Sequence, residues 1–239
     1  MFQDTRKPLK DWFVAIWWIT TQKYGASAQG LQQVLGLKSY QTAWTWLHKI
    51  RTAMVCPNRS KLSGIVEVDE GYIGGKYAGK SGRGSENKAP IAVAVAVELN
   101  GKKLGRARIS VINDASGDSL IPFVTENIEK NSKIITDGWN GFSGIESKVY
   151  ERTIHNQTTA TTEDEMLPHV HLIISLLKRW LLGTHQCAVD EKHLQAYLDE
   201  YVFRFNRRKF AQRGLLFYRL LENAMVVPPT TYRNFVDKP

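Results

Sequence analysis

The chain has 239 residues, which suits one large domain or one medium domain with a small partner. Hydrophobic residues make up 43% of the chain, so a sizeable core is available. The 32 Lys and Arg residues exceed the 23 Asp and Glu residues by nine charges, and a basic protein usually binds nucleic acid, an anionic membrane surface or an acidic partner. Neither Cys56 nor Cys187 belongs to a CxxC pair, which excludes a zinc ribbon built from this chain and suits a reducing cytoplasm.

The first region, residues 1–56, is predicted to be helical. Its apolar stretch WFVAIWWIT is shorter than the roughly 20 apolar residues that span a bilayer. No signal-peptide cleavage region follows the stretch. We therefore expect a buried helix over residues 10–23 and no contact with a membrane.

Two further helices are predicted in this region, over residues 28–35 and 40–54. Ser27 is the expected N-cap of the first helix, and the second carries Lys49 and Arg51. A short turn that contains glycine separates them. This order is the outline of a helix-turn-helix that binds DNA, and an ordinary helical hairpin is the alternative.

The second region, residues 57–210, is predicted to be an α/β domain. The expected elements are strands at residues 64–73, 91–99, 106–112, 132–136 and 149–154, and helices at residues 116–130, 163–182 and 190–208. Their order is the outline of a ribonuclease H-like core, a mixed five-stranded sheet with flanking helices. In that core the first three strands form an antiparallel meander, and the fourth lies parallel to the first. Residues 211–239 are expected to form a C-terminal tail.

The stretch VEVDEGYIGG carries three carboxylates on the first predicted strand, namely Glu67, Asp69 and Glu70. Because the fourth strand lies beside the first, Asp69 is expected close to Asp137, which follows the fourth strand. Two neighbouring carboxylates repel each other unless a cation lies between them, and oxygen ligands suit Mg²⁺. Glu67 shares the side-chain parity of Asp69 and competes with it as a ligand, whereas Glu70 has the opposite parity. A solvated strand face is the alternative for each acid.

The helix expected after the fifth strand has one narrow polar stripe. In HVHLIISLLKRWLLGTHQ, the side chains of His171, Ser175 and Lys178 fall within about 60° of one another, and His169 lies on nearly the opposite face. We expect the stripe to face the two aspartates. His171 then ligates metal or transfers protons, and Lys178 contacts phosphate. A capped or solvent-facing histidine is the alternative.

Four motifs in this order resemble the catalytic domain of ISXO2-like insertion-sequence transposases of the DDE superfamily: VEVDEGYIGGK, ITDGWNGF, HVHLIISLLKRWLLGTHQ and HLQAYLDEYVFRFNRR. The segments TRKPLKDWF and LGLKSYQTAWTWLHKIR resemble the region that precedes this domain in the family. The resemblance implies a ribonuclease H-like fold and cleavage and transfer of DNA strands that depend on Mg²⁺, with Mn²⁺ as a substitute. It also implies a homo-oligomer on DNA, in the bacterial cytoplasm at the nucleoid.

By position, Asp69 and Asp137 correspond to the two aspartates of the superfamily, and His171 occupies the third acidic position, seven residues before the basic Lys178. The resemblance implies that Asp69, Asp137 and His171 ligate the metal and that these residues and Lys178 are catalytic. Histidine is a poorer ligand for Mg²⁺ than a carboxylate, and the acids at residues 163–165 are substitutes. Relatives often begin with a zinc ribbon, for which this chain lacks the cysteines, so recognition of the DNA ends is expected to depend on the helix-turn-helix.

Basic side chains on the predicted helices are expected to neutralise DNA phosphates without reading the base sequence. The expected set is Lys49, Arg51, Lys178, Arg179, Arg204, Arg207 and Arg208. The basic, glycine-rich segment 74–88 is a further candidate for contact with DNA. A solvated basic face is the alternative.

These patterns favour a DNA transposase of an insertion sequence, which cleaves the element ends and transfers the strands into target DNA. One alternative is a nuclease or resolvase with the same core that does not join strands. The other is an inactive remnant that binds DNA and regulates parental transposition. The histidine at position 171 and the missing zinc ribbon favour the remnant.

Overall fold

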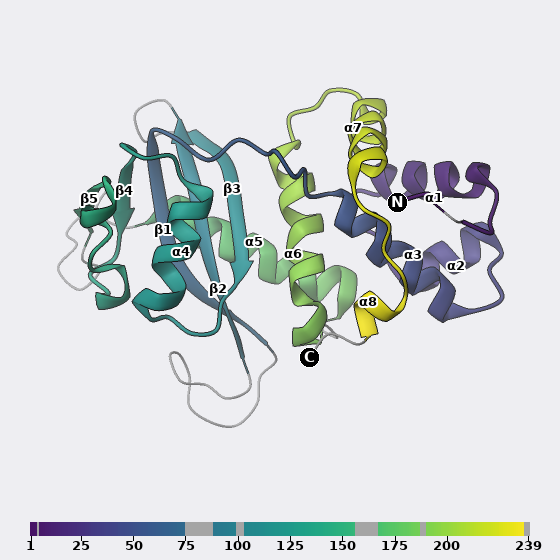
Figure 1. Cartoon of the computed structure of the whole chain (residues 1–239), viewed down its shortest axis with the longest axis horizontal. Coiled ribbons are helices and arrows are strands. Elements are labelled where there is room, and N and C mark those ends of the chain that lie inside the picture. Colours follow the sequence, from purple (N-terminus) through teal and green to yellow (C-terminus); the bar gives the residue numbers. More distant parts are fainter. Residues whose placement is uncertain (4, 75–87, 99–102, 156–166, 187–189, 237–239) are drawn as a thin grey trace. The chain divides into compact units, whose positions relative to one another are not determined.

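The computed structural model describes residues 1–3, 5–74, 88–98, 103–155, 167–186 and 190–236 (Figure 1). The chain divides into two compact units. The sheet unit is Ser60–Arg179, and the helical unit joins Met1–Arg59 to Trp180–Pro239. These units differ from the division at residues 56 and 210 suggested by the sequence, because the C-terminal helices pack with the N-terminal ones. The predicted domain boundaries stay a prediction.

The sheet unit contains a mixed five-stranded sheet in the order β3-β2-β1-β4-β5. Strands β1, β2 and β3 pair antiparallel, whereas β4 pairs parallel with both β1 and β5. The predicted ribonuclease H-like core, with its meander and its parallel fourth strand, is confirmed. The strands are β1 Ile65–Ile73, β2 Ala89–Glu98, β3 Lys103–Val111, β4 Lys133–Thr136 and β5 Glu151–Ile154.

Strand β2 lies between β1 and β3 because its residues are apolar on both faces, as a strand buried on both faces requires. Helix α4, Gly117–Asn127, covers one face of the sheet. Leu120 and Phe123 of α4 belong to the same hydrophobic cluster as Val66 and Val68 of β1. Figure 1 shows α4 on the near face of the sheet and the first turns of α5 on the far face.

Helix α5, Pro168–His185, is described from a proline at its first position. Proline is favourable there because the first turn of a helix does not need its N–H group. The predicted start at residue 163 lies outside the described residues. Ile173 of α5 is buried, and a Cβ atom on Gly71 of β1 would lie 3.2 Å from the Ile174 side chain, so α5 packs closely over β1.

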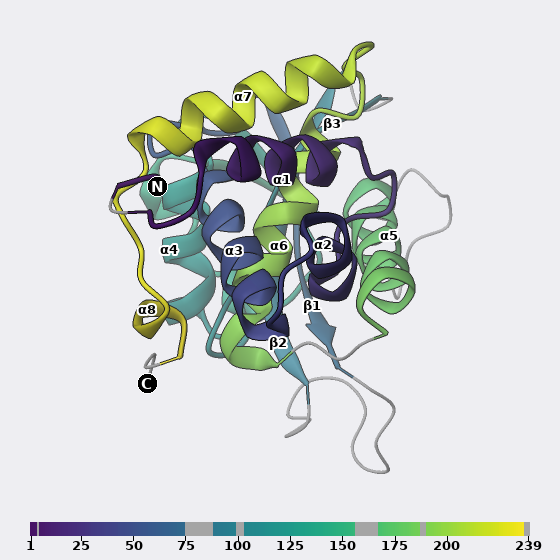
Figure 2. The same ribbon diagram turned by 90° about the vertical axis from the view of Figure 1, so that its right-hand side faces the viewer.

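The helical unit contains the three N-terminal helices that the sequence predicted (Figure 2). Trp12 and Trp46 stack in its core with their ring centroids 3.8 Å apart. The predicted cap is confirmed, because Ser27 Oγ accepts a hydrogen bond from the Gly30 N–H at 3.1 Å. In the described part of the chain, no helix is long and apolar enough to cross a membrane. The helices of the unit are α1 Leu9–Thr21, α2 Ala28–Leu35, α3 Tyr40–Ala53, α6 Glu191–Asn206, α7 Arg213–Val226 and α8 Arg233–Val236.

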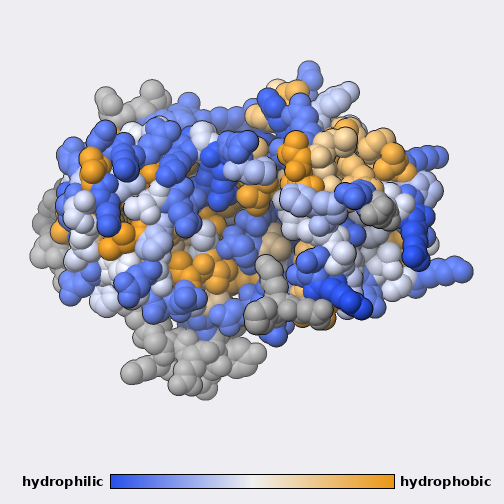
Figure 3. Space-filling view, in the orientation of Figure 1, coloured by the Kyte–Doolittle hydropathy of each residue, from blue (hydrophilic) through white to orange (hydrophobic). Residues whose placement is uncertain are grey.

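The residues that the sequence assigned to a tail contain the helix α7. Leu220 and Ala224 of α7 are buried in the same hydrophobic cluster as Trp12, and the Met1 ammonium group donates to the Ala224 carbonyl at 3.0 Å. These contacts with the N-terminal segment stabilise α7. They join residues that are far apart in sequence, so a local apolar pattern does not predict them. Hydrophobic side chains also gather on the surface over α1 (Figure 3). Among the residues of α1, Trp17 is 49% exposed.

A buried ion-pair network connects α3 to α6. Arg51 is 2% exposed, and its Nε donates to Glu200 Oε2 at 2.9 Å. Arg204 donates to Glu200 Oε1 from Nε and Nη2, and also to the carbonyls of Ile19 and Gln22. Both guanidinium groups are occupied by partners inside the helical unit, which argues against the expected contacts of Arg51 and Arg204 with DNA.

Two histidines beside this network stay neutral. Burial, and then the charge of Arg51, lowers the pKa of His48 to about 3 and that of His185 to about 4. Burial alone would raise the pKa of Glu200, but the positive charges of Arg51 and Arg204 outweigh it and lower that pKa to about 2. The neutral His48 ring packs against Trp44, with centroids 4.0 Å apart.

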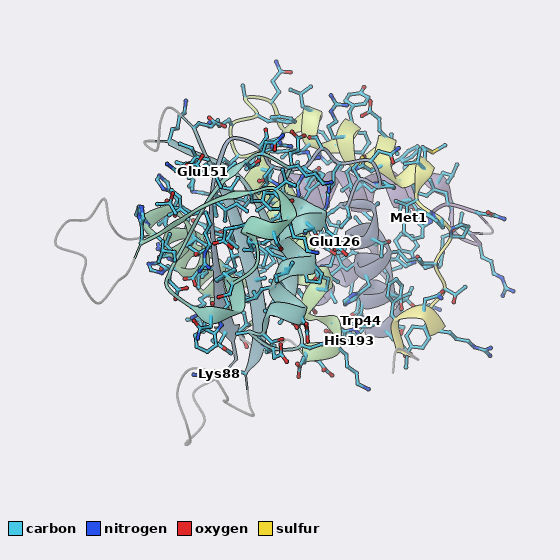
Figure 4. All side chains as sticks on the ribbon, turned by 60° about the vertical axis from the view of Figure 1, so that its left-hand side comes forward. Met1, Trp44, Lys88, Glu126, Glu151 and His193 are labelled. Carbon is cyan, nitrogen blue, oxygen red and sulfur yellow. The ribbon has the colours of Figure 1, made fainter. Side chains whose placement is uncertain are left out.

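An aromatic cluster continues outward from His48. The rings of Trp44 and His193 meet edge to face with centroids 5.0 Å apart, and Figure 4 shows these two side chains next to each other. Phe235 of α8 contacts both Trp44 and His48. The cluster therefore connects the C-terminal helix to α3 within the helical unit.

Candidate active site

Three carboxylates converge where β1 and β4 run side by side. Asp69 and Glu70 lie on β1, and Asp137 directly follows β4. One oxygen atom from each residue lies within 4.8 Å of the other two. The predicted proximity of Asp69 and Asp137 is therefore confirmed. Glu70 was not expected here, because strand alternation places neighbouring side chains on opposite faces.

Arg152 on β5 holds the loop that carries Asp137. Its Nε donates to Thr136 Oγ1 at 2.9 Å, and its Nη2 donates to the carbonyls of Asp137 and Trp139 at 3.3 Å each. Asp137 Oδ1 in turn accepts the backbone N–H of Trp139 at 3.0 Å. These contacts fix the direction in which the Asp137 carboxylate leaves the end of β4.

His171 on α5 contacts the site through Asp69. Its Nε2 lies 3.1 Å from Asp69 Oδ2, and since a carboxylate only accepts, this nitrogen carries the hydrogen. The hydrogen bond to Asp69, against some burial, raises the pKa of His171. The imidazole is 38% exposed, so solvent screens part of this attraction. His171 thus lies beside the three carboxylates, in contact with one of them.

Glu67 has a different role from the one expected of a competing ligand. Its Oε2 accepts the backbone N–H groups of His169 and Val170 at 2.9 Å each. Its Oε1 lies 2.6 Å from His169 Nδ1. Both oxygens therefore bind the first turn of α5. The sequence placed His169 and His171 on nearly opposite faces of the helix, but both imidazoles contact carboxylates of β1, and the attachment of His169 to Glu67 was not predicted.

The remaining predicted residues occupy several environments. Lys178 and Arg179 are exposed on α5. Lys49 on α3 is half-buried, and burial lowers its pKa. Arg207 and Arg208 lie over the rings of Phe203 and Phe205, with each guanidinium carbon 4.0 Å from the ring centroid. The basic residues at positions 76, 80 and 83 and the acids at positions 163–165 lie outside the described residues.

The three-carboxylate cluster, Asp69, Glu70 and Asp137, suits a hard divalent cation. Its donors are all carboxylate oxygens, the ligands that Mg²⁺ and Mn²⁺ prefer. Carboxylates at this separation, two of them buried, repel one another, and a cation between them removes that cost. The imidazole of His171 is the softer donor next to this cluster.

One family of known proteins matches the chain in sequence. The sequence profile of the ISXO2-like transposase domain matches residues 61–206, which include all three carboxylates and His171. No curated protein matches the chain in sequence.

Similar solved structures include an intasome of simian T-cell lymphotropic virus in complex with the PP2A regulatory subunit B56 gamma, with 14% identity and a TM-score of 0.40 over 81% of this chain and 71% of that one. Another is the Mos1 transposase paired-end complex, with 11% identity and a TM-score of 0.28 over 93% of this chain and 82% of that one. The profile match covers more than half of the 239 residues. The chain therefore belongs to the family of ISXO2-like transposase domains of the DDE superfamily.

Proposed function

We propose that this chain is an active transposase that cleaves DNA at the ends of an insertion sequence and joins the freed ends to target DNA. The observation that carries the proposal is the convergence of Asp69, Glu70 and Asp137 within 4.8 Å on the central strands of a ribonuclease H-like sheet. Family membership supports the same conclusion. Both DNA steps are then displacements at phosphorus at this one site.

Asp69 and Asp137 are the proposed ligands of Mg²⁺, or of Mn²⁺ as its substitute. The third ligand is either His171, as the family position implies, or Glu70, whose carboxylate lies in the cluster. The preference of hard cations for oxygen favours Glu70. When bound, the metal supplies charge neutralisation for the attacking and leaving oxygens of a phosphodiester.

The other side chains of the site handle protons and phosphates. The hydrogen on His171 Nε2 points to Asp69 Oδ2, so the imidazole orients this carboxylate and can exchange a proton with a neighbouring group. Lys178, two turns further along α5, is exposed and is proposed to contact a phosphate. With Arg51 and Arg204 removed from the set, the proposed DNA contacts are Lys49, Lys178, Arg179, Arg207 and Arg208.

The test uses the full chain and a duplex that carries the inverted repeat flanking its gene. We expect nicking and strand joining that require Mg²⁺ or Mn²⁺ and that disappear in Asp69→Ala. The matched control is Glu151→Gln, since the Glu151 side chain is 72% exposed on β5 and is not part of the cluster. Sedimentation of the protein–DNA complex tests the proposed homo-oligomer.

Each alternative function predicts a different product in this assay. Nicked DNA without joined product would indicate a nuclease or resolvase. Binding of the repeat without cleavage, in both metals, would indicate a regulator derived from a transposase and would overturn the proposal.

A further inference from the structure

We propose that Glu67 is a positioning residue of the active site, which holds the first turn of α5 and thereby holds His171 against Asp69. This inference deepens the proposed function and rests on it for the identity of the site. Glu67 does not ligate the metal in this proposal. Its role is exerted through the helix that carries His171.

The surroundings of Glu67 stabilise a buried carboxylate. The residue is 4% exposed, and a buried charge is costly unless hydrogen bonds replace its water. Three donors replace it here, namely the N–H groups of His169 and Val170 and the Nδ1 atom of His169. The amides in the first turn of a helix have no acceptor within the helix. A negative charge at this end also interacts favourably with the helix dipole.

The contacts of Glu67 and Asp69 run in parallel between the same two elements. The two residues are two positions apart on β1, so their side chains leave the same face of the strand. Glu67 binds residues 169 and 170, and Asp69 binds His171. The strand therefore binds one turn of α5 through two adjacent side chains. Loss of the hydrogen bonds of Glu67 releases the start of the helix and lets His171 move relative to Asp69.

Both carboxylate oxygens of Glu67 accept hydrogen bonds, which distinguishes a positioning residue from a metal ligand. Oε2 accepts two backbone hydrogen bonds and Oε1 accepts one from His169, so little acceptor capacity is left for a cation. The cluster of Asp69, Glu70 and Asp137 is complete without Glu67. With Asp69, Glu70 and Asp137 as the ligands, a positioning residue should change the geometry of His171 and leave the affinity for metal nearly unchanged.

The experiment compares Glu67→Gln with wild type in the full chain labelled with ¹⁵N-histidine. The glutamine keeps the shape of the side chain but removes the charge and places an amide donor among donors. Without metal or DNA, we expect the imidazole ¹⁵N and ¹H resonances of His171 to shift or broaden. The Kd for Mn²⁺, measured by electron paramagnetic resonance, is expected to change by less than about twofold, whereas Asp69→Asn weakens it by about tenfold or more.

Three further variants sharpen the test. His169→Ala keeps the two backbone hydrogen bonds of Glu67, so its His171 resonances should shift in the same direction by a smaller amount, which covers the case in which Glu67→Gln does not fold. Glu151→Gln should leave the resonances unchanged. In the cleavage assay, Glu67→Gln should lower kcat about tenfold with KM for DNA unchanged, as misplacement of a catalytic group does. Rescue of kcat by Glu67→Asp would support the role of the charge.

Two outcomes would overturn the inference. His171 resonances identical to wild type in folded Glu67→Gln would show that the contact does not position His171. A loss of Mn²⁺ affinity as large as that of Asp69→Asn would make Glu67 a ligand. Because the resonance and Mn²⁺ measurements need no DNA, failure of wild type to cleave DNA would count against the proposed function and not against this inference.

Discussion

At the scale of single residues, Glu70 and His171 are the two candidates for the third ligand of the proposed metal site. The carboxylate of Glu70 lies within 4.8 Å of those of Asp69 and Asp137, while the imidazole of His171 contacts Asp69 Oδ2 at 3.1 Å.

 Mg²⁺ and Mn²⁺ prefer oxygen to nitrogen donors, so Glu70→Gln should weaken Mn²⁺ binding by about tenfold or more, and His171→Ala should weaken it less. Titration followed by electron paramagnetic resonance measures both values, with Glu151→Gln as the control. The reverse order of the two variants would make His171 the third ligand.

The sequence predicts some of these residues and misses others for a physical reason. Asp69 and Asp137 were predicted to lie close together because the order of strands determines which strand ends are neighbours. Glu70 was missed because alternation along a strand describes where a Cβ atom points and not how far a long side chain reaches. The contact of Glu67 with His169 spans 102 positions of sequence, so no local pattern reports it.

At the scale of elements, Arg152 connects β5 to the end of β4 and so to the Asp137 loop. Arg152→Met removes every one of these donors while keeping an apolar side chain of similar length. We expect it to weaken Mn²⁺ binding about tenfold, as loss of a group that orients a ligand typically does. The matched control is Arg106→Met, because Arg106 donates to Ser60 and to the Lys61 carbonyl, away from the carboxylates. Equal effects of the two variants would indicate a general loss of stability.

Elements with a continuous local pattern were predicted well, and elements stabilised by distant contacts were not. The strand β2 was expected from its unbroken apolar run, and α2 from its capping serine and terminal glycine. Helix α7 has only Leu220 and Ala224 fully buried, and both depend on neighbours from the N-terminal helices. Residues 211–239, predicted as a tail, therefore contain a helix whose apolar side chains pack within the helical unit.

At the scale of the whole molecule, acid should unfold the helical unit through its buried ionic network. The lowered pKa values of His48, about 3, and His185, about 4, mean that the unfolded chain binds protons more readily than the folded chain, so stability falls as the pH drops below about 6.5. The lowered pKa of Glu200, about 2, adds stability that is present above pH 4.5 and lost toward pH 2. Tryptophan fluorescence reports this transition, because every tryptophan except Trp139 lies in the helical unit.

A substitution at Glu200 tests how much the ionic network contributes to the stability of the protein at neutral pH. Glu200→Gln leaves Arg51 buried without its counter-charge, so it should lower the free energy of unfolding by about 3–5 kcal/mol at pH 7. Glu191→Gln in the exposed first turn of the same helix is the control and should have a small effect. Similar stability of the two variants would contradict the role assigned to the network.

The net charge of +9 is distributed between structural and surface groups, and DNA binding should distinguish the two. Each phosphate contact contributes about 0.9 to the slope of log K against log salt, so replacing exposed Lys178 and Arg179 by Gln together should lower that slope by nearly 2. Arg51→Gln removes the same kind of charge from a side chain that is 2% exposed, so it should lower Tm and leave the slope of the folded protein unchanged. Fluorescence anisotropy with a labelled duplex at several salt concentrations measures the slope.

The control is Arg219→Gln, whose side chain is 61% exposed and pairs with Glu222 outside the proposed set. If Arg219→Gln lowered the slope by about half as much as the double variant, binding would follow total charge, and the proposed DNA contacts would then be wrong.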